Sequence, residues 1–285
     1  MLSPVEWKIR GGRSLGPAPF LVFGIVNVTP DSFHDGGQYM QLDQALAHGR
    51  MQAEAGAHVL DIGGESSRPF AAPVSLEEEK ERVVPVVEGL RDLHCVNGMP
   101  WALSVDTYKA GTAAAVLEAG AQIINDISAF AFDPALLDVV AQYKPGYILM
   151  HSLGRPTEMQ KAPEYGNVVE EILDFFEKKL KELTTAGVPE DRIMLDPGVG
   201  FGKTLEHNLA ILRGMDRFAS LGLPLMAGIS NKSMFGMLCN APAGQRQNAT
   251  QAATAILAAR GVFAHRVHDV AMTVQTLQVA QALAM

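Results

Sequence analysis

Polar side chains end several apolar stretches of this sequence. Asp106, Asn125 and Asp196 each close such a stretch, and Lys232 follows another. A buried carboxylate costs roughly several kcal/mol unless a partner satisfies it. For one residue alone, a salt bridge or a helix cap is an equally good interpretation. Four residues on four separate stretches favour convergence on a shared ligand.

The chemistry of these four side chains indicates the kind of ligand. The carboxylate of Asp196 can accept two parallel N–H bonds, Asn125 offers both a donor and an acceptor, and Lys232 offers only donors. A planar heterocycle with an amino group beside a ring N–H matches that set. We therefore predict a pterin or a purine.

A second group of residues is expected to be cationic and suited to anions: Arg68, Arg266 and His268. Arg266 and His268 lie two positions apart near the end of the last apolar stretch, so a regular strand places them on the same side. Arg68 lies in a glycine-bearing segment, and Asn27 ends the first apolar stretch. The group predicts a phosphate or diphosphate site accompanied by a hard metal ion. Pairing of Arg266 with a local acid such as Asp269 is the alternative.

Eight apolar stretches alternate with segments of helical periodicity. They read LVFGIVNV, AHVLDI (ending at Asp61), WALSVD, AQIIND, GYILMH, RIMLD, LPLMAGIS and VFAHRVH. Strands alternating with helices predict an α/β fold with a parallel sheet, and eight units predict a single (β/α)8 TIM barrel with its active site at the C-terminal mouth. We expect residues 1–20 to form an N-terminal extension, a hairpin over the barrel bottom, and residues 21–285 to form the catalytic domain.

Helix signals occupy the intervening segments. Ser75 begins one helix with a capping-box spacing to Glu78, and Pro85 is expected to kink or interrupt it. The pair Asp133–Pro134 is expected to start another helix. The stretch NVVEEILDFFEKKLKELTTAG has apolar residues three and four apart and ends at Gly187, a residue typical of a helix C-terminus.

Three glycine- and proline-bearing segments follow predicted strands: TPDSFHDGGQY, GGESSRPFAAPV and PGVGFGKT. Long loops at a barrel mouth usually belong to the active site, although the first two could serve only as connections. The third segment resembles the pattern GxxxxGK[ST], but Pro197 stands where glycine is required. We interpret its glycines as room for a flat ligand, with Phe201 as a side wall.

Composition excludes several classes of protein. The chain has 285 residues, a net charge of −8 and no basic stripe, which argues against a nucleic-acid partner. Its apolar runs are shorter than the roughly 18 residues of a membrane span, and since the N-terminal residues lack an apolar run, we expect no secretory signal. Cys95 and Cys239 cannot form a disulfide framework, and each is expected to be a small buried side chain. His265 and His268 cannot face alike on a strand, so zinc is not expected. We expect a cytoplasmic protein.

Together the motifs resemble the dihydropteroate synthase family over nearly the whole chain. They are GIVNVTPDSFHDGG, DIGGESSRP, SVDTYKA, INDIS, MHSLGRPTEMQ, DPGVGFGK, GISNKSMFG and RVHDV, in the order of the family. Each motif alone is moderately specific, whereas all of them in register are highly specific.

The resemblance implies a transferase of folate biosynthesis. Members of the family displace pyrophosphate from hydroxymethyl-dihydropterin pyrophosphate with the aniline nitrogen of para-aminobenzoate, which gives dihydropteroate. The leaving group departs before attack, and no side chain forms a covalent intermediate. The resemblance also implies Mg²⁺, a homodimer, and competition between sulfonamides and para-aminobenzoate.

The resemblance assigns this chain's residues to three groups of contacts. The pterin would be held by Asp106, Asn125, Asp196 and Lys232, with Met150, Phe201 and Gly228 lining its slot. The pyrophosphate would be bound by Asn27, Arg68, Arg266 and His268, with magnesium near Asn27. The para-aminobenzoate site would be shaped by Phe33, Ser67, Pro69, Ser233 and the stem of Lys232. The catalytic set would be Asp106, Lys232, Arg68, Arg266 and His268.

Three positions depart from the family's pattern. Ser67 replaces a threonine, Phe70 replaces a glycine, and Asn231 replaces an arginine. Loss of that positive charge predicts weaker substrate binding with the chemistry retained. Two alternatives stay open. A pterin-binding methyltransferase domain would have no use for Arg68 and the other anion-binding residues, and a pterin-binding paralogue would not catalyse a reaction.

Overall fold

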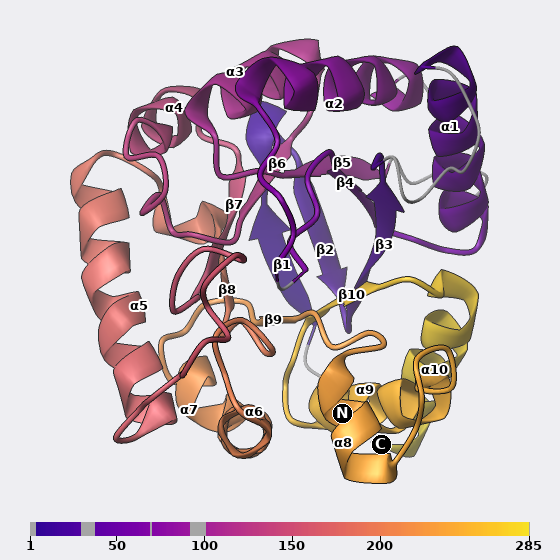
Figure 1. Cartoon of the computed structure of the whole chain (residues 1–285), viewed down its shortest axis with the longest axis vertical. Coiled ribbons are helices and arrows are strands. Elements are labelled where there is room, and N and C mark those ends of the chain that lie inside the picture. The colour runs from indigo at the N-terminus through magenta and orange to yellow at the C-terminus, as the bar shows by residue number, and fades with distance from the viewer. Residues whose placement is uncertain (1–3, 30–37, 69, 92–100, 285) are drawn as a thin grey trace.

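The computed structural model describes residues 4–29, 38–68, 70–91 and 101–284. Eight parallel strands lie in the order β8-β7-β6-β5-β4-β3-β10-β9. The two end strands meet through a parallel bridge between Leu195 and Leu225, which closes the sheet. Helices surround this ring of strands (Figure 1). The predicted (β/α)8 barrel is confirmed.

The strands are β3 (Leu21–Asn27), β4 (Val59–Gly63), β5 (Ala102–Asp106), β6 (Ile123–Asp126), β7 (Gly146–Met150), β8 (Ile193–Asp196), β9 (Met226–Ala227) and β10 (Ala264–Val267). Two predicted strand ends are wrong by more than one residue: β4 continues past Asp61 to Gly63, and β9 ends at Ala227, before Ser230. Asp61 pairs in register with Ser104, whereas Gly63 pairs with Asp106. Asp61 therefore lies one pleat deeper in the barrel than the other carboxylates.

The helices are α1 (Gln38–Glu54), α2 (Leu76–Arg91), α3 (Ala110–Ala119), α4 (Leu136–Tyr143), α5 (Val168–Thr185), α6 (Leu205–Arg213), α7 (Met215–Ala219), α8 (Ser233–Cys239), α9 (Gln247–Ala259) and α10 (Val270–Leu283). The Ser75 hydroxyl accepts the Glu78 N–H at 3.2 Å, as the capping spacing predicts. Interruption at Pro85 does not occur, because α2 runs through it. Burial of Val83, Val87 and their neighbours on α2 offsets the missing hydrogen bond.

Two other helix ends fit the sequence signals to different degrees. The segment at Asp133–Pro134 forms a turn, and α4 begins only at Leu136. The Asp133 carboxylate accepts the Ala135 N–H at 3.2 Å. Asp133 therefore bonds the residue directly before the helix. Helix α5 ends at Thr185, and Gly187 follows with a φ of 92°, a conformation that favours glycine.

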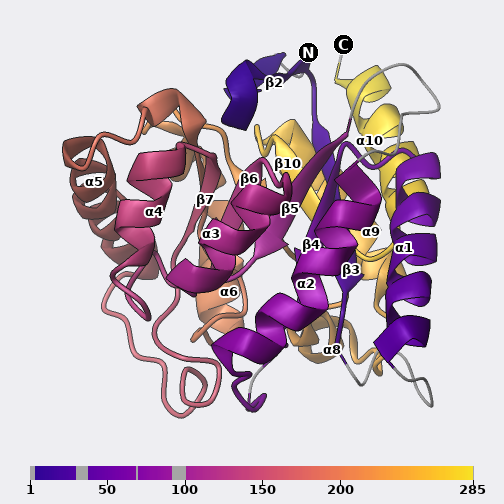
Figure 2. The same cartoon turned by 90° about the horizontal axis from the view of Figure 1, so that it is seen from above.

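Residues before the barrel form an antiparallel hairpin of β1 (Val5–Lys8) and β2 (Ser14–Ala18). Trp7 and Ile9 are fully buried in one cluster with barrel-interior residues such as Ile148 and Met194. A side chain at Gly146 would meet the Trp7 ring at 3.0 Å, so the hairpin packs directly on the strands. Figure 2 shows this N-terminal segment at one end of the barrel, where both chain termini also lie.

The barrel interior changes character along its axis. Near the hairpin it is apolar, with Phe23 and Ile123 among its residues. One step further, Asp61 and Ser104 are buried with no exposed surface. The C-terminal ends of the strands carry buried polar side chains, among them Asp106, Asn125 and Asp196. A separate, larger apolar cluster joins the outer faces of the strands to the helices.

No helix in the described ranges is both long and apolar enough to cross a membrane. Cys239 is exposed, so its predicted burial is wrong, and Cys95 lies outside the described residues.

Candidate active site

The predicted strand-end residues converge at the C-terminal mouth. Across β3 to β6, Asn27 pairs in register with Gly63, Gly63 with Asp106, and Asp106 with Asn125. On the other side, Asp196 pairs with Met150 of β7. Asp106, Asn125 and Asp196 are all buried. Because parallel strands end at one edge, these side chains share one site.

Arg266 is the centre of what we name the arginine cluster (Asp61, Asp106, Asn125, Arg266). Its Nε donates to Asp61 Oδ2 at 2.5 Å and its Nη2 donates to Asp106 Oδ2 at 2.8 Å. Asn125 Nδ2 also donates to Asp61 Oδ2, at 3.2 Å. The alternative partner, Asp269, instead caps α10 by accepting the Met272 N–H at 2.9 Å. Arg266 therefore points into the barrel mouth.

Opposing forces act on the charges of this cluster. Burial raises the pKa of Asp106 to about 7, although the Arg266 guanidinium opposes that shift and the Asp61 carboxylate adds to it. Burial also disfavours the charge of Arg266, but the two carboxylates outweigh it and hold the pKa of Arg266 above its usual value. Asp106 thus titrates close to neutral pH.

A second group forms the lysine cluster (His151, Asp196, Lys203, Lys232). Lys232 Nζ donates to the Val199 carbonyl and lies 4.6 Å from the centre of the Phe201 ring. Lys203 Nζ donates to the Phe201 carbonyl at 2.9 Å and lies 3.0 Å from His151 Nδ1. Backbone carbonyls, rather than carboxylates, thus accept from both amines.

The lysine cluster also titrates unusually. Burial lowers the pKa of Lys232 to about 8, although Asp196 opposes the shift. Burial likewise raises the pKa of Asp196, and Lys232 opposes that shift. Burial and the charge of Lys203 lower the pKa of His151 to about 3, so its imidazole is neutral at physiological pH.

Gly228 lies between the two clusters. A Cβ atom at this position would lie 3.9 Å from Asp196 Oδ2 and 3.8 Å from Arg266 Cβ. Glycine therefore leaves room for a flat ring beside the carboxylate. Met150 belongs to a small apolar cluster at the mouth, against which the partly buried Phe201 packs.

The predicted anion-binding residues need one correction. Burial and the charges of Arg266 and Arg68 lower the pKa of His268 to about 4, so His268 is a neutral imidazole rather than a cation. Its Nδ1 lies 2.9 Å from Ser230 Oγ. Arg68 is exposed on the loop after β4. The neutral ring can still donate one N–H to an anion.

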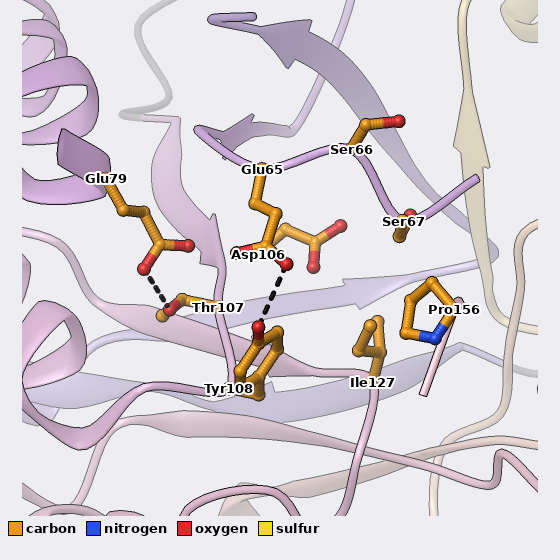
Figure 3. A pocket seen from close by; sticks show the side chains of 9 residues that line it. All are labelled: Glu65, Ser66, Ser67, Glu79, Asp106, Thr107, Tyr108, Ile127 and Pro156. Carbon is orange, nitrogen blue, oxygen red and sulfur yellow. Dashed lines mark hydrogen bonds between the residues drawn. The ribbon is translucent and has the colours of Figure 1, made fainter. Parts of the chain in front are cut away.

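The para-aminobenzoate residues are described only in part, because Phe33 and Pro69 lie outside the described residues. Ser67 lines a small cavity with Asp106, Tyr108 and Pro156 (Figure 3). Ser233 is exposed at the first position of α8, directly after Lys232.

Beside this cavity lies a hydrogen-bond network that the sequence does not predict. Glu65 accepts from the Tyr108 hydroxyl at 2.9 Å, from Lys109 Nζ at 2.5 Å and from the Val74 N–H at 3.2 Å. Figure 3 shows Glu65 bonded to Tyr108. Glu65 thereby ties together the two ends of the loop that carries Arg68. No motif or spacing signals this role.

Two of the departing positions have left-handed backbone. Phe70 has a φ of 66° and Asn231 a φ of 56°. Glycine would adopt the first conformation without strain, and asparagine tolerates the second. The Phe70 N–H donates to the Pro156 carbonyl at 2.9 Å, which joins two mouth loops. Arg246 Nη1 donates to the Asn231 carbonyl at 3.3 Å.

Comparison with known proteins identifies relatives of this chain. A family model described as a pterin binding enzyme matches residues 23–268. Dihydropteroate synthase of Escherichia coli strain K12 is 41% identical over 271 residues, which cover 95% of this chain and 94% of that protein. The Bacillus subtilis strain 168 enzyme of the same name is 42% identical over 251 residues, 88% of this chain and 84% of that protein.

Solved structures agree with the sequence relatives. Dihydropteroate synthase of Yersinia pestis in complex with a sulfonamide drug has a TM-score of 0.89 and 42% identity, covering 98% of this chain and 99% of that one. The Xanthomonas albilineans enzyme with 4-aminobenzoic acid has a TM-score of 0.88 and 42% identity, covering 99% and 98%. The same enzyme with 7,8-dihydropteroate has a TM-score of 0.84 and 40% identity, covering 97% and 98%. This chain belongs to the dihydropteroate synthase family of pterin binding enzymes.

Proposed function

We propose that this transferase condenses hydroxymethyl-dihydropterin pyrophosphate with para-aminobenzoate, giving dihydropteroate and pyrophosphate in folate biosynthesis. The observation that carries the proposal is the convergence of Asp106, Asn125, Asp196 and Lys232 with Arg266 at one mouth. Relatives named dihydropteroate synthase that cover nearly the whole chain do not favour the methyltransferase alternative.

The lysine cluster supplies the edge that reads the pterin. Asp196 accepts the Gly198 N–H through Oδ1 at 2.8 Å, and its Oδ2 lies beside the space at Gly228. That oxygen can accept from the amino edge of the ring. Lys232 and Asn125 then meet the remaining ring acceptors and donors, while Met150 and Phe201 line the slot.

The other end of the substrate carries the diphosphate. Arg266 donates to carboxylates from Nε and Nη2, so Nη1 can donate to an anion. His268 can donate from Nε2 when its Nδ1 accepts from Ser230. Arg68 adds a charge from the loop after β4. A bound diphosphate would favour the imidazolium form and raise the pKa of His268.

We propose that magnesium reaches this mouth together with the substrate phosphates and binds near Asn27. Among the described residues, no group of three or more His, Cys, Asp or Glu side chains could hold a metal. Mg²⁺ bound to substrate phosphates needs only one or two protein ligands, and the amide oxygen of Asn27 is a suitable hard donor. When bound, the ion would neutralise charge on the departing pyrophosphate.

The reaction we propose is a dissociative displacement. Pyrophosphate leaves first, and ionised Asp106 stabilises the electron-deficient pterin methylene. The aniline nitrogen of para-aminobenzoate then attacks from a site shaped by Ser67, Ser233, the Lys232 stem, Phe33 and Pro69. Exclusion of water protects the cation from hydrolysis. We expect the enzyme to be a homodimer, which sedimentation would test.

Pyrophosphate release measured with and without para-aminobenzoate tests the proposal. Release that requires both substrates supports the synthase. Release from the pterin substrate alone would make the protein a hydrolase, and pterin binding without release would make it a non-catalytic paralogue. Sulfonamide inhibition that excess para-aminobenzoate relieves is expected as well.

A further inference from the structure

Lys203 is a buried charged residue type with no assigned task. Its relative exposure is 3%, and none of the ion pairs among the described residues includes it. Its Nζ donates to the Phe201 carbonyl at 2.9 Å and the His151 carbonyl at 3.4 Å, and it lies 3.0 Å from His151 Nδ1. Burial and the charge of Lys232 lower the pKa of Lys203 well below its usual value. The amine meets three polar partners, two backbone carbonyls and one imidazole nitrogen.

The loop that carries Lys203, residues 198–203, is held by side chains along its length. Gln160 donates to the Gly200 carbonyl at 2.8 Å, and Tyr165 donates to the Gly202 carbonyl at 3.0 Å. Lys232 donates to the Val199 carbonyl. Residues from two other loops therefore fix this loop before any ligand binds.

Glycines bring the same loop into contact with the end of β7. A Cβ atom at Gly198 would lie 1.9 Å from the His151 carbonyl oxygen, and one at Gly202 would lie 2.4 Å from Leu153 Cβ. Both glycines have positive φ values, 67° and 66°. The loop 198–203 and the residues after β7 are in such close contact that a hydrogen bond between them determines their relative position.

We propose that Lys203 is a positioning residue for the pterin slot. By joining the carbonyl of Phe201 to that of His151, it holds the Phe201 ring beside Lys232 and next to Met150. Phe201 lies in the loop after β8, and His151 follows directly after β7. A single amine therefore fixes two walls of the slot. The inference rests on the proposed pterin site.

The test is Lys203→Met, which keeps the length of the side chain and removes its nitrogen. Two buried carbonyls lose a donor, and the KM for the pterin pyrophosphate is expected to rise about tenfold. The KM for para-aminobenzoate is expected to stay within about twofold, because none of the residues assigned to that site belongs to the loop 198–203 or to the end of β7. Lys179→Met is the matched control, since Lys179 pairs with Glu182 on α5.

Tyr165→Phe is the second variant and removes only the hydroxyl that holds Gly202. It is expected to fold, and it should raise the KM for the pterin pyrophosphate about threefold, again with little effect on para-aminobenzoate. Equal loss for both substrates, or a fall in melting temperature with both KM values unchanged, would overturn the inference.

Asn125→Ala separates the inference from the function it rests on. If Asn125→Ala raises the KM for the pterin pyrophosphate but Lys203→Met and Tyr165→Phe do not, only the role of Lys203 is wrong. If Asn125→Ala leaves that KM unchanged, the pterin site itself is misplaced.

Discussion

The arginine cluster and the lysine cluster share one barrel mouth but stabilise their charges differently. In the arginine cluster, Arg266 bonds to two carboxylates, Asp61 and Asp106, at 2.5 and 2.8 Å. In the lysine cluster, Lys203 and Lys232 donate to backbone carbonyls. In the first arrangement each charge is bonded to a charge of opposite sign, which supports the fold. In the second, Asp196 and Lys232 are not bonded to each other, so both remain available for a ligand.

The largest expected effect follows from that difference. Arg266→Met leaves two buried carboxylates without their positive partner, and it is expected to lower the free energy of unfolding by about 3–5 kcal/mol. Lys232→Met removes one bond to a carbonyl and is expected to cost only about 1 kcal/mol. Urea unfolding of both variants at pH 7.5 measures the contrast. Equal losses in stability would remove the distinction between the clusters.

A second effect is the pH dependence of the free energy of unfolding, to which His151 of the lysine cluster contributes. His151 has a pKa of about 3 in the fold and an ordinary value of 6.5. The unfolded chain therefore binds more protons between these values, so the stability is present above pH 6.5 and is lost as the pH falls. From pH 6.5 to 5 we expect a loss of about 2 kcal/mol from this residue. His151→Gln should lack that part of the loss in urea titrations, and an unchanged slope would contradict the shift.

Enzyme activity should respond to one group from each cluster. For kcat/KM of the pterin substrate, Asp106 must be ionised, so activity rises through pH about 7. Lys232 must be protonated, so activity falls above pH about 8. Asp106→Asn should flatten the acidic limb and Lys232→Arg should move the alkaline one. Limbs that persist unchanged in both variants would assign the titration to the substrate.

The smallest expected effect concerns Asn231, one of the three positions at which the resemblance to the family predicts another residue, here arginine. Asn231→Arg restores a positive charge, and we expect KM values about two- to threefold lower. The φ of 56° is less favourable for arginine than for asparagine, so stability should fall by about 1 kcal/mol. Unchanged Michaelis constants for both substrates would contradict the predicted role of charge.

The sequence predicts one kind of site residue well. Asp106, Asn125 and Asp196 stand where an apolar strand stops, and barrel geometry alone brings such positions together. Asp61 is also visible in its stretch, but its depth depends on β4 continuing to Gly63. The pairing of Arg266 with Asp61 joins residues 205 positions apart and has no local signal.

Other residues cannot be found from sequence pattern. In the sequence Lys203 looks like part of a failed phosphate motif, and nothing there signals that its amine bonds to the carbonyl of His151, 52 positions away, as well as to that of Phe201. Glu65 acts through Tyr108, in the loop after β5, and through Val74, at the far end of its own loop. The neutral state of His268 depends on burial and on the charges of Arg266 and Arg68. Each of these properties arises only from packing.

Calorimetric titration of Asp196→Asn with pteroic acid tests the central assignment most directly. Asparagine keeps the shape but loses one acceptor, and we expect pteroic acid to bind about a hundredfold more weakly than to the unchanged protein. Asp138→Asn, on the exposed face of α4, is the matched control and should bind normally. Affinity of Asp196→Asn equal to that of the control would contradict a pterin held at this mouth.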